Sequence, residues 1–254
     1  MTQKQHNDLY AGLASVVALA ARGCRVEKSG STWNRRIMLP NTSPSPTFDR
    51  AFRADLEQLF AWRRDVRRFR CEPLEANALD ELVALTAYAP SVGYSQPSRF
   101  VRVRDAHRRE RIIAEYERAN ADAATAYAGE RRATYIGLKL AGLREAPEHV
   151  AVFVDEATAR GEGLGRRLMP EMLAYSTVLA VHTLWLAARA RGIGVGWVSI
   201  VDPGAIVAIL DVPRAWQLVA YLCVGYPQEE HLDRELARAG WEERDRSATA
   251  IIER

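Results

Sequence analysis

The spacing of apolar residues along the chain predicts helices that alternate with short strands. Apolar positions three or four residues apart, which form one face of a helix, occur over residues 55–62, 75–87, 105–144, 170–191 and 203–210. Short apolar runs of strand length occur at 100–103, at 150–154, after the glycines of 192–196, and at 219–224. Four short strands among helices predict an α+β or α/β layered fold.

Two of these regions have distinctive patterns. The 170–191 helix is nearly apolar all round, which predicts a place at the centre of the fold or of a dimer. Its uncharged stretch is shorter than the ~20 residues needed to span a membrane. The long charged region 105–144 contains Gly129, where we expect an interruption, and residues 161–170 form a Gly-rich loop that we expect to be mobile.

The first 48 residues differ from the rest and predict an N-terminal extension, disordered or loosely helical, before a domain over 49–254. They end in a linker with three prolines, which cannot continue a helix. The apolar run from Leu9 to Cys24 resembles a signal peptide, but Asp8 abuts it and Arg22 stands where a small residue is required. We therefore expect a soluble, cytoplasmic protein.

Composition excludes several classes of function. The chain has 254 residues and a net charge of +3, which is too mild to indicate binding to nucleic acid or to an anionic membrane. The three cysteines and five histidines show no spacing typical of a metal site, so no metal is expected. Three widely separated cysteines are typical of free thiols in a reducing cytosol.

Candidate chemistry begins with Arg-Arg-Asp-Val-Arg at 63–67, directly after the first helix. Guanidinium groups offer a rigid fork of donors to phosphate and to carbonyl oxygens. A solvated basic turn, with Asp65 as the ion-pair partner of the arginines, would have the same composition, and this run alone leaves both interpretations open.

Two further segments could contact a flat ligand. Residues 89–97 (Ala-Pro-Ser-Val-Gly-Tyr-Ser-Gln-Pro) form a loop rich in hydrogen-bonding groups. Gly192, Gly194 and Gly196 precede Ser199 in helix-to-strand order, the reverse of a dinucleotide-binding turn. Glycines there would let the backbone approach a ligand closely. An ordinary loop and an ordinary helix-to-strand turn remain alternatives.

Together, in this order and at these distances, the three segments resemble the FMN-binding nitroreductase family. Residues 63–67, 89–97, 129–143, 175–190 and 194–200 are similar to its 5,6-dimethylbenzimidazole synthase branch. The resemblance extends from about Leu56 to Trp241. Ordinary members of the family usually have Ser where this chain has Asp65.

The resemblance implies an α+β fold with a central mixed sheet of four to five strands flanked by helices. It also implies a domain-swapped homodimer with an FMN site at each end of the subunit interface. Arg63, Arg64 and Arg67 match positions that hold the flavin phosphate and the polar edge of the ring, and a lid over 128–143 covers the ring. Asp65 and Ser199 match the catalytic residues, and the flavin-binding set is Arg63, Arg64, Asp65, Val66, Arg67, Ser91, Gly93, Tyr94, Gln96, Leu138, Lys139 and Ser199.

The implied activity is an oxygen-dependent fragmentation of reduced FMN. The products are 5,6-dimethylbenzimidazole, the lower ligand of cobalamin, and erythrose 4-phosphate. Asp65 would act as a base whose pKa the neighbouring arginines lower. Because the lid leaves no room for a nicotinamide, a separate NAD(P)H flavin reductase supplies reduced FMN. An NAD(P)H-dependent nitroreductase and a non-catalytic flavin-binding protein are the alternatives.

Overall fold

The computed structural model describes residues 45–245 and 247–254. Residues Asp49–Arg254 form one compact unit. The extension predicted over residues 1–48 lies outside the described residues except for its last four, so that prediction stays open.

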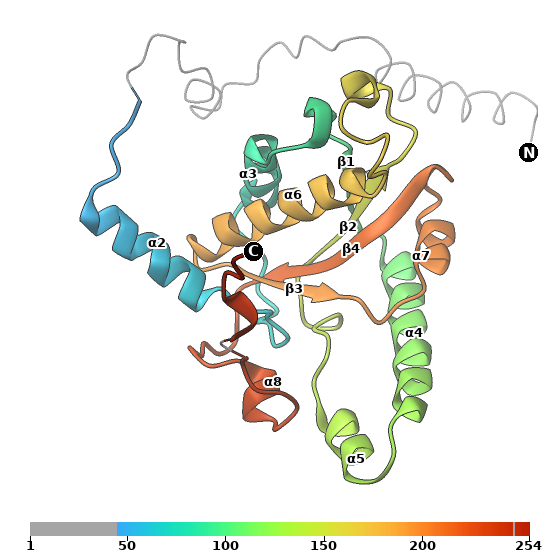
Figure 1. Cartoon of the computed structure of the whole chain (residues 1–254). Coiled ribbons are helices and arrows are strands. Elements are labelled where there is room, and N and C mark those ends of the chain that lie inside the picture. Colours follow the sequence, from blue (N-terminus) through green and yellow to red (C-terminus); the bar gives the residue numbers. More distant parts are fainter. Residues whose placement is uncertain (1–44, 246) are drawn as a thin grey trace, which may run out of the picture. The chain divides into compact units, whose positions relative to one another are not determined.

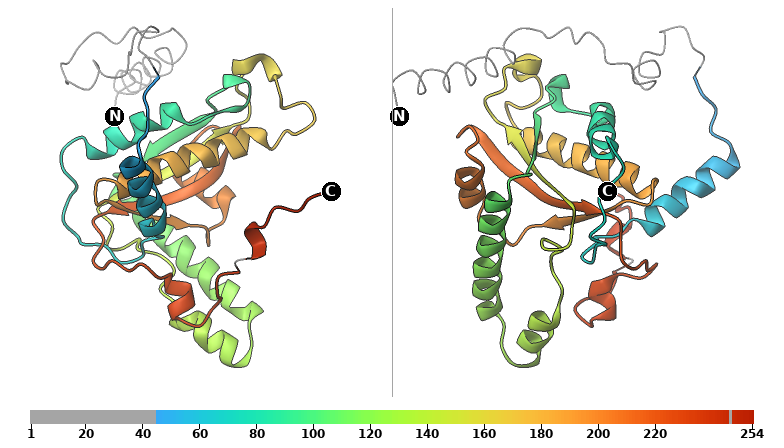
Figure 2. Two further views of the ribbon diagram at one scale, coloured as in Figure 1. Left: turned by 60° about the vertical axis from the view of Figure 1, so that its left-hand side comes forward. Right: turned by 180° about the vertical axis from the view of Figure 1, so that it is seen from behind.

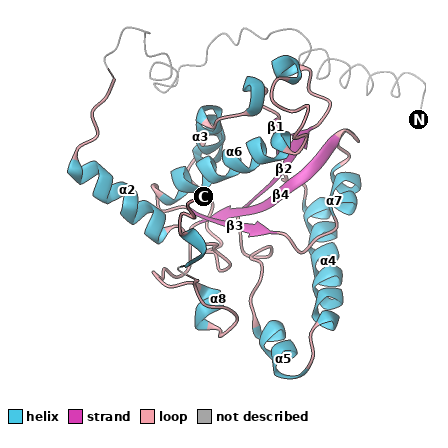
Figure 3. Ribbon diagram, in the orientation of Figure 1, coloured by secondary structure: helices cyan, strands magenta, loops and turns pink. Residues whose placement is uncertain are grey.

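Four strands form one central sheet in the order β1-β2-β4-β3 (Figure 3). They are β1 Ser98–Arg102, β2 Glu148–Asp155, β3 Gly194–Val198 and β4 Trp216–Gly225. All three strand pairs are antiparallel. The predicted α+β fold is confirmed. The prediction of a mixed sheet is wrong for these four strands, because parallel pairing among the described residues is limited to one isolated bridge beside β3.

Helices cover both faces of the sheet (Figure 1). On β2, Val150 and Val152 point to one face, where they pack with α3 Ala78–Leu85 and α6 Met172–Arg189. Ala151 and Phe153 point to the other face, where the core includes residues of α4 Ala106–Ala123 and α7 Pro203–Leu210. Side chains alternate along a strand, so an uninterrupted apolar run supplies both cores.

The helix α2 Arg50–Trp62 begins five residues before the predicted start. The carboxylate of Asp49 accepts a hydrogen bond from the Phe52 N–H and caps the helix, a contact that the apolar spacing does not reveal. The helix buries none of its residues, and Phe60 is half exposed. Figure 2 shows it projecting from the body of the domain.

The region predicted to be helical over 105–144 is two helices. The first, α4, ends at Ala123; a 3-10 turn follows over Ala124–Ala126, and α5 spans Gly129–Gly137. The interruption predicted at Gly129 is confirmed, with φ +53° at that residue. The helical prediction for 138–144 is wrong, since that stretch is irregular. Figure 2 shows α5 well away from the sheet.

The apolar helix α6 is buried along one side only. Its other side exposes Tyr175, Val178 and Leu179. No helix among the described residues is long and apolar enough to cross a membrane. A short helix, α8 Glu235–Arg238, lies in the C-terminal segment that follows β4.

Candidate active site

The arginine-rich segment leaves α2 at Arg63, whose extended backbone ends the helix, and runs beside the edge strand β3. Asp65 forms a parallel bridge with Val195, and the Val66 N–H donates to the Val195 carbonyl at 3.0 Å. Residues 63–67 are therefore fixed to the sheet. A solvated basic turn, the alternative interpretation, would not need these bonds.

The glycines of β3 make room for this segment. A β-carbon on Gly196 would lie 2.2 Å from the Val66 carbonyl oxygen, and one on Gly194 would lie 2.8 Å from the Val66 side chain. The sequence suggested that these glycines admit a flat ligand. That interpretation is wrong for this pair, because the backbone that approaches them is the chain's own segment around Val66.

Asp65 is held by two donors. One carboxylate oxygen accepts from the Trp197 N–H at 2.8 Å, and the other accepts from Arg67 Nε at 3.1 Å. Burial raises the pKa of Asp65 above its usual value, and the hydrogen bond from Trp197 and the positive charges of Arg67 and Arg63 only partly offset this effect. The arginines do lower the pKa of Asp65, as predicted, but the predicted net lowering is wrong because desolvation outweighs them.

Arg67 links the acidic group to the predicted lid. Its guanidinium also donates to the Lys139 carbonyl at 3.2 Å, and the Lys139 ammonium pairs with Glu145. Leu138, beside Lys139, is half-buried. Two of the predicted flavin-contacting residues thus lie next to the Asp65–Arg67 pair.

Arg63 and Arg64 are partly desolvated cations. The Arg63 guanidinium lies 4.8 Å from the ring centroid of Trp185, and no salt bridge to it is found among the described residues. Arg64 donates to the carbonyls of Leu232 and Asp233. Burial lowers the pKa of both arginines, and the neighbouring Arg234 adds to the effect. Such a cluster of positive charge fits an anion such as a phosphate group.

Ser199 directly follows β3, and its side chain is exposed. It lies two residues after Trp197, whose N–H holds the Asp65 carboxylate. Its hydroxyl makes no hydrogen bond with another described residue. It is therefore available to a ligand at the end of β3.

The Ser91–Gln96 loop is built around internal hydrogen bonds. The Ser91 hydroxyl accepts from the Gln96 N–H at 3.1 Å, and the Val92 N–H donates to the Ser176 hydroxyl of α6 at 3.0 Å. Tyr94 has a positive φ of 54°, and its side chain is exposed. The loop thus presents an aromatic ring and polar groups from a fixed backbone.

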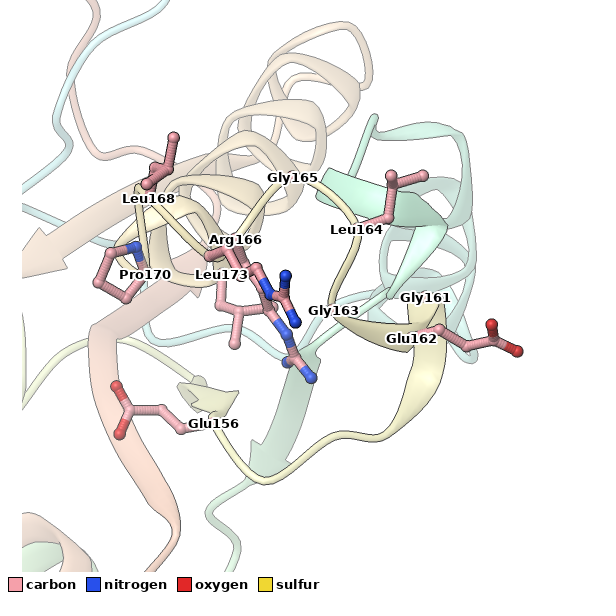
Figure 4. Close-up of a pocket in the computed structure, with 11 residues that line it drawn as sticks. Glu156, Gly161, Glu162, Gly163, Leu164, Gly165, Arg166, Leu168, Pro170 and Leu173 are labelled. Atoms are coloured by element: carbon pink, nitrogen blue, oxygen red, sulfur yellow. The ribbon is translucent and has the colours of Figure 1, made fainter.

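A second loop, the Gly-rich segment 160–170, packs against the first. Gly161 approaches Gly93 so closely that a β-carbon on Gly161 would lie 2.4 Å from the Gly93 carbonyl oxygen. Figure 4 shows this loop curving around Arg166, with Leu164 and Leu168 at its rim. Arg166 donates to the Thr158 carbonyl, and an open cavity of about 1190 Å³ lies along the loop.

The predicted site residues therefore fall into two groups within one chain. The first group, which we call the acidic half-site, contains residues 63–67, 138–139 and 199; the second, the loop half-site, contains residues 91–96. No hydrogen bond among the described residues joins the two groups. The cavity at the arginines measures only about 50 Å³, whereas ligand pockets measure roughly 300 Å³ or more. The described residues contain no cluster suited to a metal ion.

Sequence reasoning missed several groups that shape the acidic half-site. The Trp197 N–H and the carbonyls of Leu232 and Asp233 act through the backbone, so residue type carries no signal for them. Trp185 could have been noticed as an aromatic residue on an apolar helix, but only the fold places it under Arg63.

Comparison with known proteins gives a consistent picture. The model of the nitroreductase family matches residues 60–226. A 5,6-dimethylbenzimidazole synthase of Rhodospirillum rubrum is 56% identical over 199 residues, which cover 78% of this chain and 94% of that protein. One from Rhodobacter capsulatus is 44% identical over 196 residues, 77% of this chain and 95% of that protein.

Solved structures show the same fold. An oxidized iodotyrosine deiodinase bound to FMN and 3-iodo-L-tyrosine superposes with a TM-score of 0.59 at 26% identity, covering 69% of this chain and 91% of that one. A nitroreductase-like protein of Streptococcus mutans gives 0.55 at 20% identity, covering 73% and 96%. The chain therefore belongs to the nitroreductase family and, within it, to the 5,6-dimethylbenzimidazole synthases.

Proposed function

We propose that this protein converts reduced FMN and dioxygen into 5,6-dimethylbenzimidazole and erythrose 4-phosphate. The observation that carries the proposal is the half-buried Asp65 carboxylate, held between the Trp197 N–H and Arg67 and next to the positive charge of Arg63 and Arg64. The R. rubrum and R. capsulatus relatives bear the name of this activity.

The donor set fits FMN. Arg63 and Arg64 supply charge for the phosphate and for the polar edge of the ring, and the exposed Ser199 hydroxyl supplies a hydrogen bond beside Asp65. When bound, reduced FMN supplies the electrons that react with dioxygen. The iodotyrosine deiodinase of the same fold binds FMN.

Asp65 is suited to general base catalysis. Its raised pKa makes the carboxylate more basic than that of an ordinary aspartate, and a more basic carboxylate accepts a proton more readily. The two hydrogen bonds fix the orientation of its oxygens, so a proton is removed at a defined position. Arg67 compensates the charge that remains on the carboxylate.

A homodimer completes the site in this proposal. Each half-site is incomplete alone, and a second copy can set its loop half-site against the acidic half-site of the first. The exposed apolar side of α6, with Tyr175, Val178 and Leu179, offers a surface for that contact. The flavin is then enclosed at each end of the interface.

We further propose that residues 128–143 act as a lid and that a separate NAD(P)H flavin reductase delivers the reduced flavin. The lid's attachment at Lys139 to Arg67 supports its position beside the ring. A covered ring excludes water and also excludes a nicotinamide.

The test is a single turnover. The protein is mixed anaerobically with chemically reduced FMN, air is admitted, and the products are identified by mass spectrometry. We expect 5,6-dimethylbenzimidazole from the unmodified chain and none from Asp65→Asn or Ser199→Gly. Intact FMN with a stoichiometric yield of hydrogen peroxide would overturn the proposal. Steady turnover of NADPH with a nitroaromatic would instead support an ordinary nitroreductase.

A further inference from the structure

The C-terminal segment 229–241 runs from the acidic half-site to the outer helix α5. At one end, Arg64 donates to the carbonyls of Leu232 and Asp233, and Arg68 pairs with Glu235 of α8 at 2.7 Å. The chain then turns back, and the Trp241 N–H donates to the Leu236 carbonyl at 2.8 Å. The indole of Trp241 is thus carried on a segment that is itself fixed to the arginines.

The helix α5 has little else to hold it. Tyr135 is its one buried residue, and its main neighbour is the 3-10 turn Ala124–Ala126 that precedes it. The neighbour of Tyr135 on this helix, the apolar Ile136, is 63% exposed. A nine-residue helix with so few contacts is not stable by itself in water.

Trp241 packs against α5 and the residues just before it. Its ring meets Tyr127 edge-on at 5.2 Å between centroids, and Tyr127 stacks on Tyr135 at 4.9 Å. The Arg131 guanidinium lies 3.7 Å from the centroid of the Trp241 ring and donates to the Trp241 carbonyl at 2.6 Å. The Tyr135 hydroxyl donates to Asn120 of α4 at 2.8 Å, which connects this aromatic cluster to α4.

From this geometry we infer that Trp241 is a positioning residue that holds the lid closed. The helix α5 continues directly into Leu138 and Lys139, and the Lys139 carbonyl accepts from Arg67 beside Asp65. Arg67 therefore holds the inner end of the lid, and Trp241 holds its outer helix together with the Tyr135–Asn120 hydrogen bond. The inference rests on the proposed function for what the lid covers, but the attachment itself does not depend on it.

The expected consequence of losing Trp241 is a change in the fate of the flavin. An open lid admits water to the ring, and reduced flavin then reacts with dioxygen by the simple route. In that route two electrons and two protons pass from reduced FMN to dioxygen, which gives intact FMN and hydrogen peroxide. Asp65 and its hydrogen bonds stay in place, so the fragmentation reaction slows without being abolished.

The experiment uses the full chain with Trp241→Ala, Trp241→Phe and Arg131→Ala. The matched control is Arg70→Ala, which removes another guanidinium from an aromatic ring, that of Tyr226 at 5.0 Å, at a site away from α5. The first readout is hydrogen exchange of residues 129–137 in flavin-free protein. The second is the ratio of hydrogen peroxide to 5,6-dimethylbenzimidazole in a single turnover at saturating reduced FMN.

We expect Trp241→Ala to speed exchange in 129–137 roughly tenfold and to raise the product ratio by a similar factor. Arg131→Ala should do the same to a smaller extent, Trp241→Phe should restore most of both values, and Arg70→Ala should leave both unchanged. A merely structural role would lower the melting temperature and the amount of active protein without changing the ratio.

Unchanged exchange in Trp241→Ala would overturn the inference, whatever the enzyme makes. Faster exchange with an unchanged product ratio would also overturn it, because the lid would then be loosened without consequence for the flavin. If the unmodified chain itself returns only intact FMN, the proposed function fails, and the exchange data still decide whether Trp241 holds α5.

Discussion

The acidic half-site and the loop half-site are held in different ways. Asp65 and Val66 are bonded to the edge of the sheet, and the partners Val195 and Trp197 belong to a buried strand. The Ser91–Gln96 loop rests on α6 and on a second loop whose leucines are largely exposed. The half-site that we assign to proton transfer is thus fixed to the sheet of one chain, and the half-site that we assign to binding is an exposed loop, which a second copy completes in our proposal.

Asp65→Asn tests the acidic half-site, and we expect it to have the largest effect. We expect the rate of fragmentation to fall by roughly 10²–10⁴-fold, the usual contribution of a positioned base, while flavin still binds. Because the pKa of Asp65 is raised, ionisation of this carboxyl costs folding stability as the pH rises above 3.8. The amide removes that cost, but it has only one acceptor oxygen, so either the Trp197 N–H or Arg67 loses its acceptor. The two effects oppose each other, and we expect only a small change in stability at pH 7.

The pH dependence gives an independent check on the same residue. Activity of the unmodified chain should be lost as the pH falls through the Asp65 pKa, at a pH above the 3.8 of an ordinary aspartate. A rate in Asp65→Asn within a few-fold of the original would contradict the assignment.

The next largest effect is expected from Leu179→Asp on the exposed side of α6. A charge forced into an apolar interface should weaken dimerisation by roughly 2–5 kcal/mol and reduce flavin binding with it. Sedimentation and flavin titration measure both. Ile251→Asp places the same charge on an exposed apolar residue of the tail and serves as the control. A dimeric Leu179→Asp variant with full flavin affinity would show that α6 is not the interface.

Alanine at two glycines compares the half-sites directly. Gly196→Ala should push Val66 away from β3 and destabilise the fold by roughly 1–3 kcal/mol, with a loss of activity. Gly161→Ala produces a similar clash with Gly93 but in a loop, so we expect weaker flavin binding with a smaller change in melting temperature. Equal losses of stability in the two variants would show that the two half-sites are held equally firmly, which would contradict the comparison.

The smallest effect is expected from Arg160→Ala. Its guanidinium donates to the Gln96 side chain at 2.8 Å in an exposed setting, where such contacts contribute about 0–1 kcal/mol. Flavin affinity should change by less than about fivefold. A larger loss would mean that Arg160 itself contacts the ligand.

Sequence patterns predicted much of this molecule because much of it depends on local signals. The apolar spacing predicted the central helix α6 closely, and the run of residues around Asp65 indicated the family that the comparisons confirm. The predicted roles of Asp65 and Ser199 stay predictions.

The errors share a different cause. The role of Gly194 and Gly196 and the direction of the Asp65 pKa shift both depend on contacts between segments distant in the chain. The contacts of Trp241, which the sequence did not predict, are of the same kind. Burial of Asp65 depends on β3 and on residues 138–139, which are distant in the chain, so the neighbouring arginines could not reveal the net pKa shift.

The hydrogen bond between Asp65 and Trp197 spans 132 positions of the chain. During synthesis, the acidic group therefore leaves the ribosome long before the strand that orients it. Contacts so distant in sequence form late in folding, because closing a long loop is entropically costly. In a partly made chain the Asp65 carboxylate therefore lacks the strand that orients it. The geometry that we assign to proton transfer arises only once nearly the whole domain has folded.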